Sequence, residues 1–271
     1  MERIKEALDR AKKARGGSGA WSSDAKLEAN PWSRRVHAPD GFNYTRTRSV
    51  TLSQDVLTRR RIVIHESGPS ADAYRILGTQ VLQRMQAQEW NTLAITSAGA
   101  GEGKTITAIN LAISLAMGVD RTVLLVDADL RAPRLHSVLG LPQGPGLSDY
   151  LISDVPLEQI LVHPSIGKLV VLPGGKALTN SSEMLASRKM ASLVQELKTR
   201  YSTRYVIFDL PPLLNAADAL AFSPMADAVL LVVEDSKTRR EDVARAAQLL
   251  GRQNLLGLVL NKARRETWRH D

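Results

Sequence analysis

The chain of 271 residues contains no cysteine, which excludes disulfides and thiolate metal sites and fits a reducing compartment. No run approaches the roughly 18 apolar residues that a membrane-spanning helix needs. The first fifteen residues, MERIKEALDRAKKAR, mix charges throughout and lack the apolar core of a signal peptide. We therefore expect a soluble, cytoplasmic protein.

The positive charge is concentrated in the N-terminal quarter. Residues 1–66 contain 14 Lys and Arg against 8 Asp and Glu, which gives +6 of the total formal charge of +8 and leaves +2 for the remainder. A basic arm of this kind can bind nucleic acid or anionic lipid. A solvated, partly disordered extension is the commoner reason for a charge run. We favour the extension and expect no nucleic acid partner.

Three regions follow from composition. In residues 1–15, Ile4, Leu8 and Ala11 form a narrow apolar stripe, which predicts a short helix suited to docking on a partner. Residues 16–58, rich in Gly, Ser, Pro and charge, read as a flexible basic linker. Residues 59–271 form the main domain, where a short strand is expected at residues 60–65 and a helix at residues 71–85.

From residue 91 onward, apolar and β-branched runs alternate with helical segments. The runs are TLAITS, RTVLLVD, KLVVLP, RYVIFDL, DAVLLVV and LLGLVLN, and helices are expected at residues 105–117, 182–198 and 239–251. Continuous apolar strands separated by helices predict an α/β fold with a doubly wound, mainly parallel sheet. In such sheets, ligands bind at the carboxyl ends of the strands.

The stretch TSAGAGEGKT lies between an expected strand and an expected helix. Glycines there allow backbone N–H groups to converge on phosphates, and the helix N-terminus adds a positive dipole end. Lys104 would reach the β- and γ-phosphates and the Thr105 hydroxyl would bind Mg²⁺. Ala98 occupies the first glycine position of the phosphate-loop pattern, so the opening of the loop is expected to differ. The candidate nucleotide-binding residues are Gly99, Ala100, Gly101, Glu102, Gly103, Lys104, Thr105 and Ile106.

Carboxylates close two further apolar runs. Asp127 and Asp129 end VLLVDAD, and side chains at i and i+2 share one face of a strand. Asp209 ends YVIFD in the manner of a Walker B aspartate, which holds Mg²⁺. Solvated loop aspartates are the alternative, but three acids, a lysine and a hydroxyl at three strand ends favour a phosphate site.

These motifs resemble those of the bacterial tyrosine kinases of capsule and exopolysaccharide assembly, over residues 70–262. The resemblance rests on AGAGEGKT, VDADLRAPRLHSVLG and FDLPP, supported by GLSDYL, NSSEML and GLVLN. It is greatest to the stand-alone kinases encoded with exosortase-type exopolysaccharide clusters. It implies the P-loop NTPase fold shared with partitioning and division-site proteins, and phosphoryl transfer from Mg-ATP to a tyrosine hydroxyl.

Position by position, the resemblance assigns catalytic roles to Lys104, Asp127, Asp129 and Asp209. Asp127 would take the proton of the incoming tyrosine, and Thr105, Asp129 and Asp209 would support Mg²⁺. Asn261 would read adenine. The resemblance also implies a membrane-embedded chain-length or export activator, whose cytoplasmic tail completes the site and holds the kinase at the inner face of the membrane.

Two features depart from the family pattern. Residues 206–271 contain no tyrosine, so autophosphorylation of a C-terminal tyrosine cluster is not expected, and Tyr44 is the best internal acceptor. In the ring-forming helix pattern, Asp72 and Arg75 keep the first two places, but Gly78 replaces the last arginine. A homo-oligomeric ring is therefore in doubt.

Two alternatives to the kinase stay open. One is a non-kinase ATPase switch like the partitioning proteins, although Gly99 stands where those carry a signature lysine. The other is a nucleotide-binding subunit of the export machinery without kinase activity.

Overall fold

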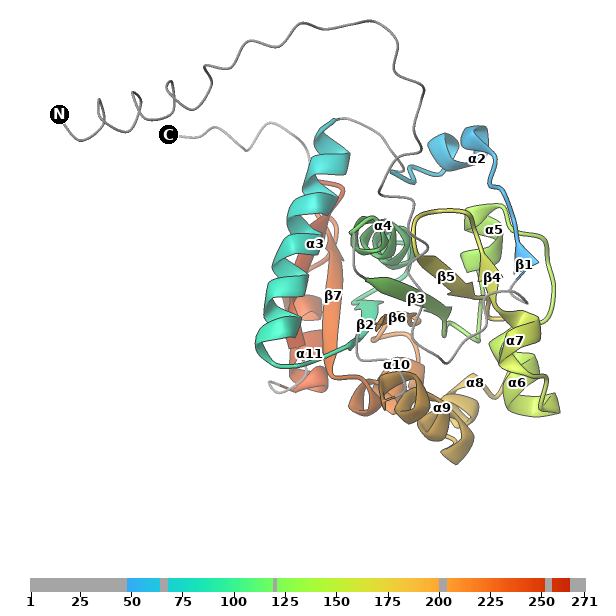
Figure 1. The fold of residues 1–271 in the computed structure, drawn as a ribbon. Helices are drawn as coiled ribbons and strands as arrows, with labels where there is room; N and C mark the ends of the chain where they lie inside the picture. Colours follow the sequence, from blue (N-terminus) through green and yellow to red (C-terminus); the bar gives the residue numbers. More distant parts are fainter. Residues whose placement is uncertain (1–47, 64–67, 119–120, 200–203, 252–254, 264–271) are drawn as a thin grey trace, which may run out of the picture. The chain divides into compact units, whose positions relative to one another are not determined.

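The computed structural model describes residues 48–63, 68–118, 121–199, 204–251 and 255–263. Within them, eight strands form one sheet in the order β1-β4-β5-β3-β6-β2-β7-β8 (Figure 1). Neighbouring strands run parallel except β4 and β5, which are antiparallel. The strands are β1 (Arg48–Ser49), β2 (Thr92–Ser97), β3 (Thr122–Asp127), β4 (Val162–His163), β5 (Leu169–Leu172), β6 (Arg204–Asp209), β7 (Ala228–Glu234) and β8 (Leu255–Asn261).

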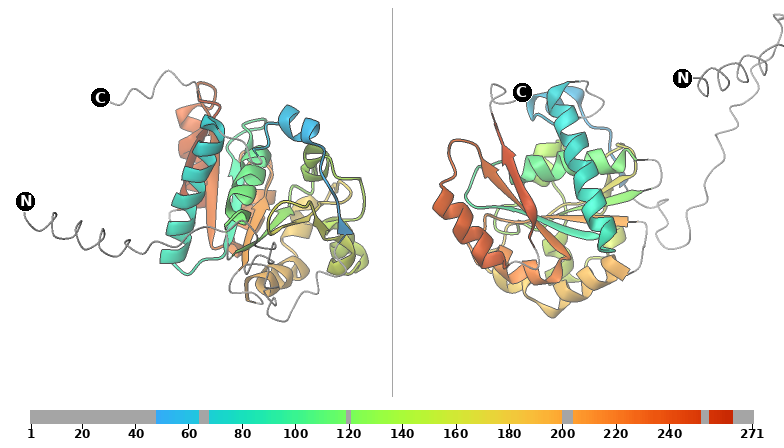
Figure 2. Two further views of the ribbon diagram at one scale, coloured as in Figure 1. Left: turned by 45° about the horizontal axis from the view of Figure 1, so that its top comes forward. Right: turned by 90° about the vertical axis from the view of Figure 1, so that its left-hand side faces the viewer.

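Helices cover both faces of the sheet (Figure 2). One apolar cluster holds side chains of α2 to α5 and the other holds side chains of α6 to α11, with the sheet between them. The helices are α2 (Gln54–Arg59), α3 (Pro69–Ala87), α4 (Lys104–Ala116), α5 (Leu135–Leu139), α6 (Leu147–Ser153), α7 (Leu157–Ile160), α8 (Ser181–Leu185), α9 (Arg188–Thr199), α10 (Asp218–Phe222), the 3₁₀ helix η2 (Ser223–Met225) and α11 (Arg240–Leu250). No helix among these described residues is long and apolar enough to cross a membrane.

The central strands are apolar on both faces because both faces are covered. Every residue of β2 is buried, and β7 is buried except at its last residue. This arrangement explains why the sequence shows continuous apolar runs there rather than alternation. The predicted α/β fold with a mainly parallel sheet is confirmed, and all six strands predicted from residue 91 onward are present.

The helix predicted at residues 182–198 is wrong in one respect, because it is two helices. α8 ends at Leu185, and α9 begins at Arg188. The Ser187 side chain accepts a hydrogen bond from the N–H of Met190 at 3.1 Å, which caps the new helix. A serine in an apparently continuous helical pattern was the signal for this break.

The strand predicted at residues 60–65 is also wrong over its described part. Arg60 and Arg61 form the turn after α2, with Arg61 at φ +58°. The side chain of Asn110 in α4 bonds to the backbone of this segment instead. It accepts from the N–H of Val63 at 2.9 Å and donates to the Arg61 carbonyl at 3.0 Å. A side chain therefore replaces the strand partner.

The predicted linker ends too late. β1 and α2 lie within its last residues, β1 pairs with β4, and Leu57 of α2 is buried in the core. The structured domain therefore begins before residue 59. The helix predicted at residues 1–15 and the rest of the linker lie outside the described residues.

Gly78 allows α3 to approach α4 closely. A Cβ atom at Gly78 would lie 2.8 Å from the Ser114 hydroxyl oxygen, closer than real Cβ contacts. The same hydroxyl donates to the carbonyl of Tyr74 one turn earlier, at 3.1 Å. The glycine that interrupts the ring-helix pattern thus has a packing role within this chain.

Candidate nucleotide site

The loop between β2 and α4 turns on two glycines. Gly101 and Gly103 have φ values of +78° and +97°, in the left-handed region that side chains disfavour. Ala98, in the position where the pattern has its first glycine, is fully buried without a positive φ. The expectation that alanine would alter the loop opening is therefore not supported, since this position needs no glycine conformation.

Three adjacent strands bring the predicted acids beside this loop. In the sheet order β3-β6-β2, Asp127 at the end of β3 is the direct register partner of Asp209 at the end of β6. Asp209 in turn pairs with Ile95 of β2, two residues before the end of that strand. The carboxyl ends of parallel strands share one edge, so the three motifs meet there.

Lys104 is surrounded by carboxylates. Its Nζ lies 2.8 Å from Asp129 Oδ2 and 3.6 Å from Asp209 Oδ1, and 13% of its side chain is exposed. The Thr105 hydroxyl donates to Asp209 Oδ2 at 2.6 Å. Four of the predicted site residues are thus in direct contact.

Burial and the neighbouring charges together shift the pKa values in this cluster. Burial would lower the pKa of Lys104, but the charges of Asp209, Asp129 and Asp127 hold this pKa above its usual value. Burial raises the pKa of Asp209. Burial together with the charge of Asp209 raises the pKa of Asp127 to about 7. Three carboxylates face one lysine, an excess of negative charge that suits a cation.

Asp127 differs from Asp129 in its surroundings. Its Oδ2 accepts from the N–H groups of Arg134 and Leu135 at 3.0 and 2.9 Å, at the start of α5. Its Oδ1 is buried and has no hydrogen-bond partner among the described residues. Asp129, by contrast, is occupied by Lys104. The structure therefore separates two acids that the sequence could not distinguish.

The residues present fit Mg²⁺ bound together with phosphate rather than a metal bound by protein alone. The described residues contain no group of three or more His, Cys, Asp or Glu arranged to hold a metal. Mg²⁺ usually keeps several waters and takes one or two protein oxygens plus substrate phosphates. The Thr105 hydroxyl and the carboxylates of Asp129 and Asp209 offer such a set.

Asn261 ends β8 and contacts the loop. Its Nδ2 donates to the carbonyl of Glu102 at 2.8 Å, and a Cβ at Gly103 would lie 2.1 Å from the same nitrogen. Asn261 thus lies beside the loop at the end of β8, and its amide nitrogen donates to the loop backbone. Ala100 and Ile106 lie at the exposed tip of the loop and in the first turn of α4.

Sequence reasoning missed several polar residues of this edge. Arg131 Nη2 lies 3.2 Å from Oδ2 of Asp218, whose side chain is fully buried. Thr238 and Lys262 contact the loop from the ends of β7 and β8. A buried aspartate at the start of α10 gave no pattern signal, and the other two residues lie more than 130 positions from their partners.

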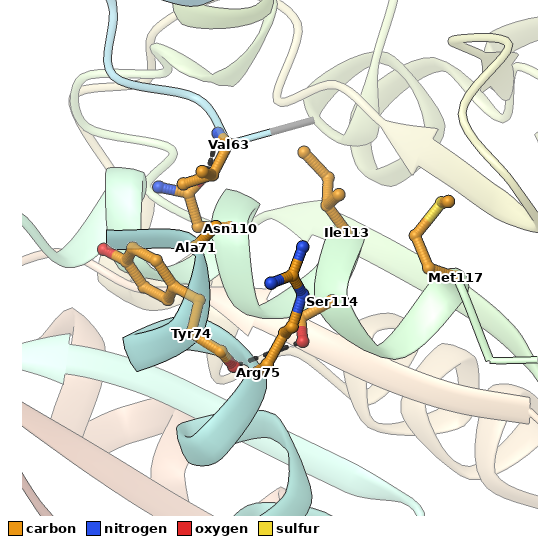
Figure 3. Close-up of a pocket in the computed structure, with 8 residues that line it drawn as sticks. All are labelled: Val63, Ala71, Tyr74, Arg75, Asn110, Ile113, Ser114 and Met117. Carbon is orange, nitrogen blue, oxygen red and sulfur yellow. Dashed lines mark hydrogen bonds between the residues drawn. The ribbon is translucent and has the colours of Figure 1, made fainter. Parts of the chain in front are cut away.

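A separate cleft of about 150 Å³ lies between α3 and α4 (Figure 3). Tyr74 and Arg75 line it from α3, and Ser114 and Met117 line it from α4. None of the residues that line it is a predicted site residue.

A glycine-rich loop between a buried strand and a helix, with a lysine, a hydroxyl and acids from neighbouring strands, defines a P-loop nucleotide-binding protein. A family model described as "AAA domain" matches residues 90–252. The tyrosine-protein kinase YwqD of Bacillus subtilis (strain 168) is 36% identical over 194 residues, covering 71% of this chain and 81% of that protein. The chain therefore belongs to the family of bacterial tyrosine-protein kinases.

Further comparisons agree with this assignment. The succinoglycan biosynthesis transport protein ExoP of Rhizobium meliloti (strain 1021) is 35% identical over 84% of this chain, which spans only 29% of that protein. The kinase domain of the Escherichia coli tyrosine kinase ETK superposes with a TM-score of 0.68 at 28% identity, covering 82% of this chain and 91% of that one. The septum site-determining protein MinD of Pyrococcus horikoshii OT3, complexed with Mg-ADP, gives a TM-score of 0.52 at 27% identity over 63% and 69%. The chain thus shares its fold with a protein whose structure holds Mg-ADP.

Proposed function

We propose that the chain is an ATP-dependent protein-tyrosine kinase that transfers the γ-phosphoryl group of Mg-ATP to a tyrosine hydroxyl. One observation carries the proposal: the loop lysine, the Thr105 hydroxyl and three buried carboxylates converge at the carboxyl ends of β2, β3 and β6. Phosphoryl transfer requires mainly positioning and neutralisation of charge, and this cluster supplies both.

Each side chain has a role in this proposal. Lys104 neutralises the β- and γ-phosphates, and Thr105 with Asp129 and Asp209 supports Mg²⁺, which supplies the charge that balances the phosphates. Asp127 accepts the proton of the tyrosine hydroxyl. Its Oδ2 is fixed by two backbone N–H groups, while its Oδ1 has no partner among the described residues and can receive the proton.

Of the three described tyrosines, Tyr74 lines the cleft between α3 and α4, and the rings of the other two lie against a cation. Lys189 lies over the ring of Tyr150, 4.9 Å from its centre, and Arg121 lies 5.5 Å from the ring centre of Tyr205. We therefore propose that the acceptor is Tyr44, which lies outside the described residues, or a tyrosine of another protein. We further propose a role in exopolysaccharide synthesis or export, in line with the name of the relative ExoP, with a membrane-embedded activator as partner.

The test is phosphotransfer from γ-labelled Mg-ATP to a synthetic glutamate–tyrosine copolymer, followed by phosphoamino-acid analysis. Wild type is compared with Lys104→Met and with Lys168→Met, which removes an exposed lysine at the opposite, amino end of β5. We expect phosphotyrosine with wild type and Lys168→Met, and none with Lys104→Met. Labelled free phosphate without phosphotyrosine would instead indicate an ATPase switch. Nucleotide binding without turnover would indicate a subunit without kinase activity.

A further inference from the structure

Two side chains at the end of β8 hold carbonyl groups of the nucleotide loop. Lys262 Nζ donates to the carbonyl of Gly101 at 2.9 Å, and Asn261 Nδ2 donates to the carbonyl of Glu102 at 2.8 Å. Lys262 itself has φ +60°, a strained conformation that brings its side chain back toward the loop. Both contacts run from a side chain to the backbone, and among the described residues no backbone N–H donates to either carbonyl.

The direction of these bonds determines where the loop N–H groups point. In a trans peptide, the carbonyl of one residue and the N–H of the next point in opposite directions. The carbonyls of Gly101 and Glu102 face β8, so the N–H groups of Glu102 and Gly103 face away from it. The two N–H groups therefore lie on the side of the loop away from the Lys262 and Asn261 side chains. In the sheet order, β7 and β2 lie between β8 and β6. Asp209, at the end of β6, accepts the hydrogen bond from the Thr105 hydroxyl. Positive φ at Gly101 and Gly103, on either side of Glu102, is the backbone pattern of an anion-binding nest.

A second connection holds the side chain of Glu102. The Thr238 hydroxyl donates to Glu102 Oε1 at 2.7 Å and accepts from the N–H of Glu234 at 2.8 Å. Glu102 is only 5% exposed. Glu234 Oε2 lies 2.9 Å from Lys262 Nζ and 3.1 Å from Lys237 Nζ, and these hydrogen bonds lower the pKa of Glu234. The ends of β7 and β8 are thereby joined to each other and to the loop.

We propose that Lys262 and Thr238 are positioning residues that hold the nucleotide loop in its phosphate-binding conformation before nucleotide arrives. The inference rests on the proposed function only in that the loop binds the phosphates of a nucleotide. A loop that is already ordered loses less conformational entropy on binding, so its affinity is higher than that of a loop without these contacts. Both residues act through the backbone and through Glu102, not on the phosphates themselves.

Lys262→Met removes the donor while keeping most of the side-chain length. We expect it to weaken binding of Mg-ADP, measured by titration calorimetry, by about tenfold, at the lower end for a charged hydrogen bond because 41% of the side chain is exposed. The matched control is Lys237→Met, which removes the other lysine that pairs with Glu234; among the described residues, the side chain of Lys237 bonds to Glu234 and not to the loop. The control should change the affinity by less than about twofold. Equal affinities of the two variants would overturn the role of Lys262.

Thr238 offers a test by rescue. Thr238→Val is close in shape but has no hydroxyl, whereas Thr238→Ser keeps the hydroxyl. We expect weaker Mg-ADP binding for the valine variant and near wild-type binding for the serine variant, with similar thermal unfolding of both. Equal binding by both variants would contradict a positioning role. If wild type binds Mg-ADP without forming phosphotyrosine, the kinase proposal fails and the positioning role remains testable. If wild type binds no Mg-ADP, both fail.

Discussion

Replacing Asp227 with asparagine is expected to destabilise the domain without touching the nucleotide site. Asp227 Oδ2 accepts from the N–H groups of Asn91 and Thr92 at 3.1 and 3.0 Å and from the Thr92 hydroxyl at 2.7 Å. Its Oδ1 pairs with Lys198 of α9, and 7% of its side chain is exposed. One carboxylate thus connects the amino ends of β2 and β7 with a helix.

Asparagine retains one acceptor oxygen but loses the charge and turns an N–H₂ group toward Lys198 or toward the backbone donors. Hydrogen bonds to charged groups contribute about 1.5–3 kcal/mol each. Because part of the geometry survives, we expect a loss of about 2 kcal/mol in the free energy of unfolding. For a domain of this size, that corresponds to a fall in Tm of about 4–8 °C.

The loss should depend on pH with a defined sign. Burial would raise the pKa of Asp227, but hydrogen bonds from Lys198, Thr92 and the backbone N–H groups together lower it. A carboxyl group with a lowered folded pKa contributes stability fully above its unfolded pKa of about 4, and that stability disappears as the pH falls through the folded pKa. The gap between wild type and Asp227→Asn should be constant from pH 8 to pH 5.5 and narrow below pH 4.

Urea unfolding followed by circular dichroism at a series of pH values measures this gap. The matched control is Asp154→Asn, which removes the carboxylate of an ion pair with Lys189 in which Asp154 is 87% exposed. Exposed pairs contribute little, so the control should change the free energy of unfolding by less than about 0.5 kcal/mol. A gap for Asp227→Asn no larger than that of the control, or one that widens in acid, would refute the reasoning.

Three further variants or conditions test other parts of the account. Gly103→Ala should weaken Mg-ADP binding at least tenfold in calorimetry, because φ is +97° at this residue and the new Cβ would lie 2.1 Å from Asn261 Nδ2. An affinity within twofold of wild type would contradict the loop geometry. Gly78→Ala should lower the free energy of unfolding, measured in urea, by about 1 kcal/mol, although alanine has the better helix propensity. Adding Ser114→Ala to the same chain should restore most of the lost stability. Purely additive effects of the two substitutions would contradict the close α3–α4 contact. In thermal unfolding, Mg-ADP at a hundred times its Kd should stabilise wild type by about 2.7 kcal/mol, and the same concentration should not stabilise Lys104→Met. Equal stabilisation of the two proteins would show that Lys104 does not contact the nucleotide.

Local patterns in the sequence were sufficient for the loop and for six of the eight described strands, but not for the two-residue strands β1 and β4. The central strands are buried on both faces, so their apolar runs were unmistakable, and β2 and α4 begin and end within a residue of the predicted positions. The acids Asp127 and Asp209 could be placed together because strand ends in a parallel sheet share an edge.

Contacts between distant residues could not be predicted in this way. Thr238 and Glu102 are 136 positions apart, and Lys262 and Gly101 are 161 apart, so no periodicity links them. Gly78 was interpreted as a lost charge partner, since only the structure shows Ser114 against it. Residues 60–65 were predicted as a strand, but the backbone groups of Arg61 and Val63 bond to the Asn110 side chain instead of to a neighbouring strand. A residue pattern does not reveal the partners of backbone hydrogen bonds.

The most direct test of the central claim is a crystal structure with bound Mg-ADP. The account predicts the β-phosphate within the loop of Gly101 to Thr105, Lys104 in contact with it, and Mg²⁺ at the Thr105 hydroxyl beside Asp209. Lys104 still paired with Asp129, with nucleotide bound elsewhere, would contradict the assignment of this edge of the sheet as the nucleotide site.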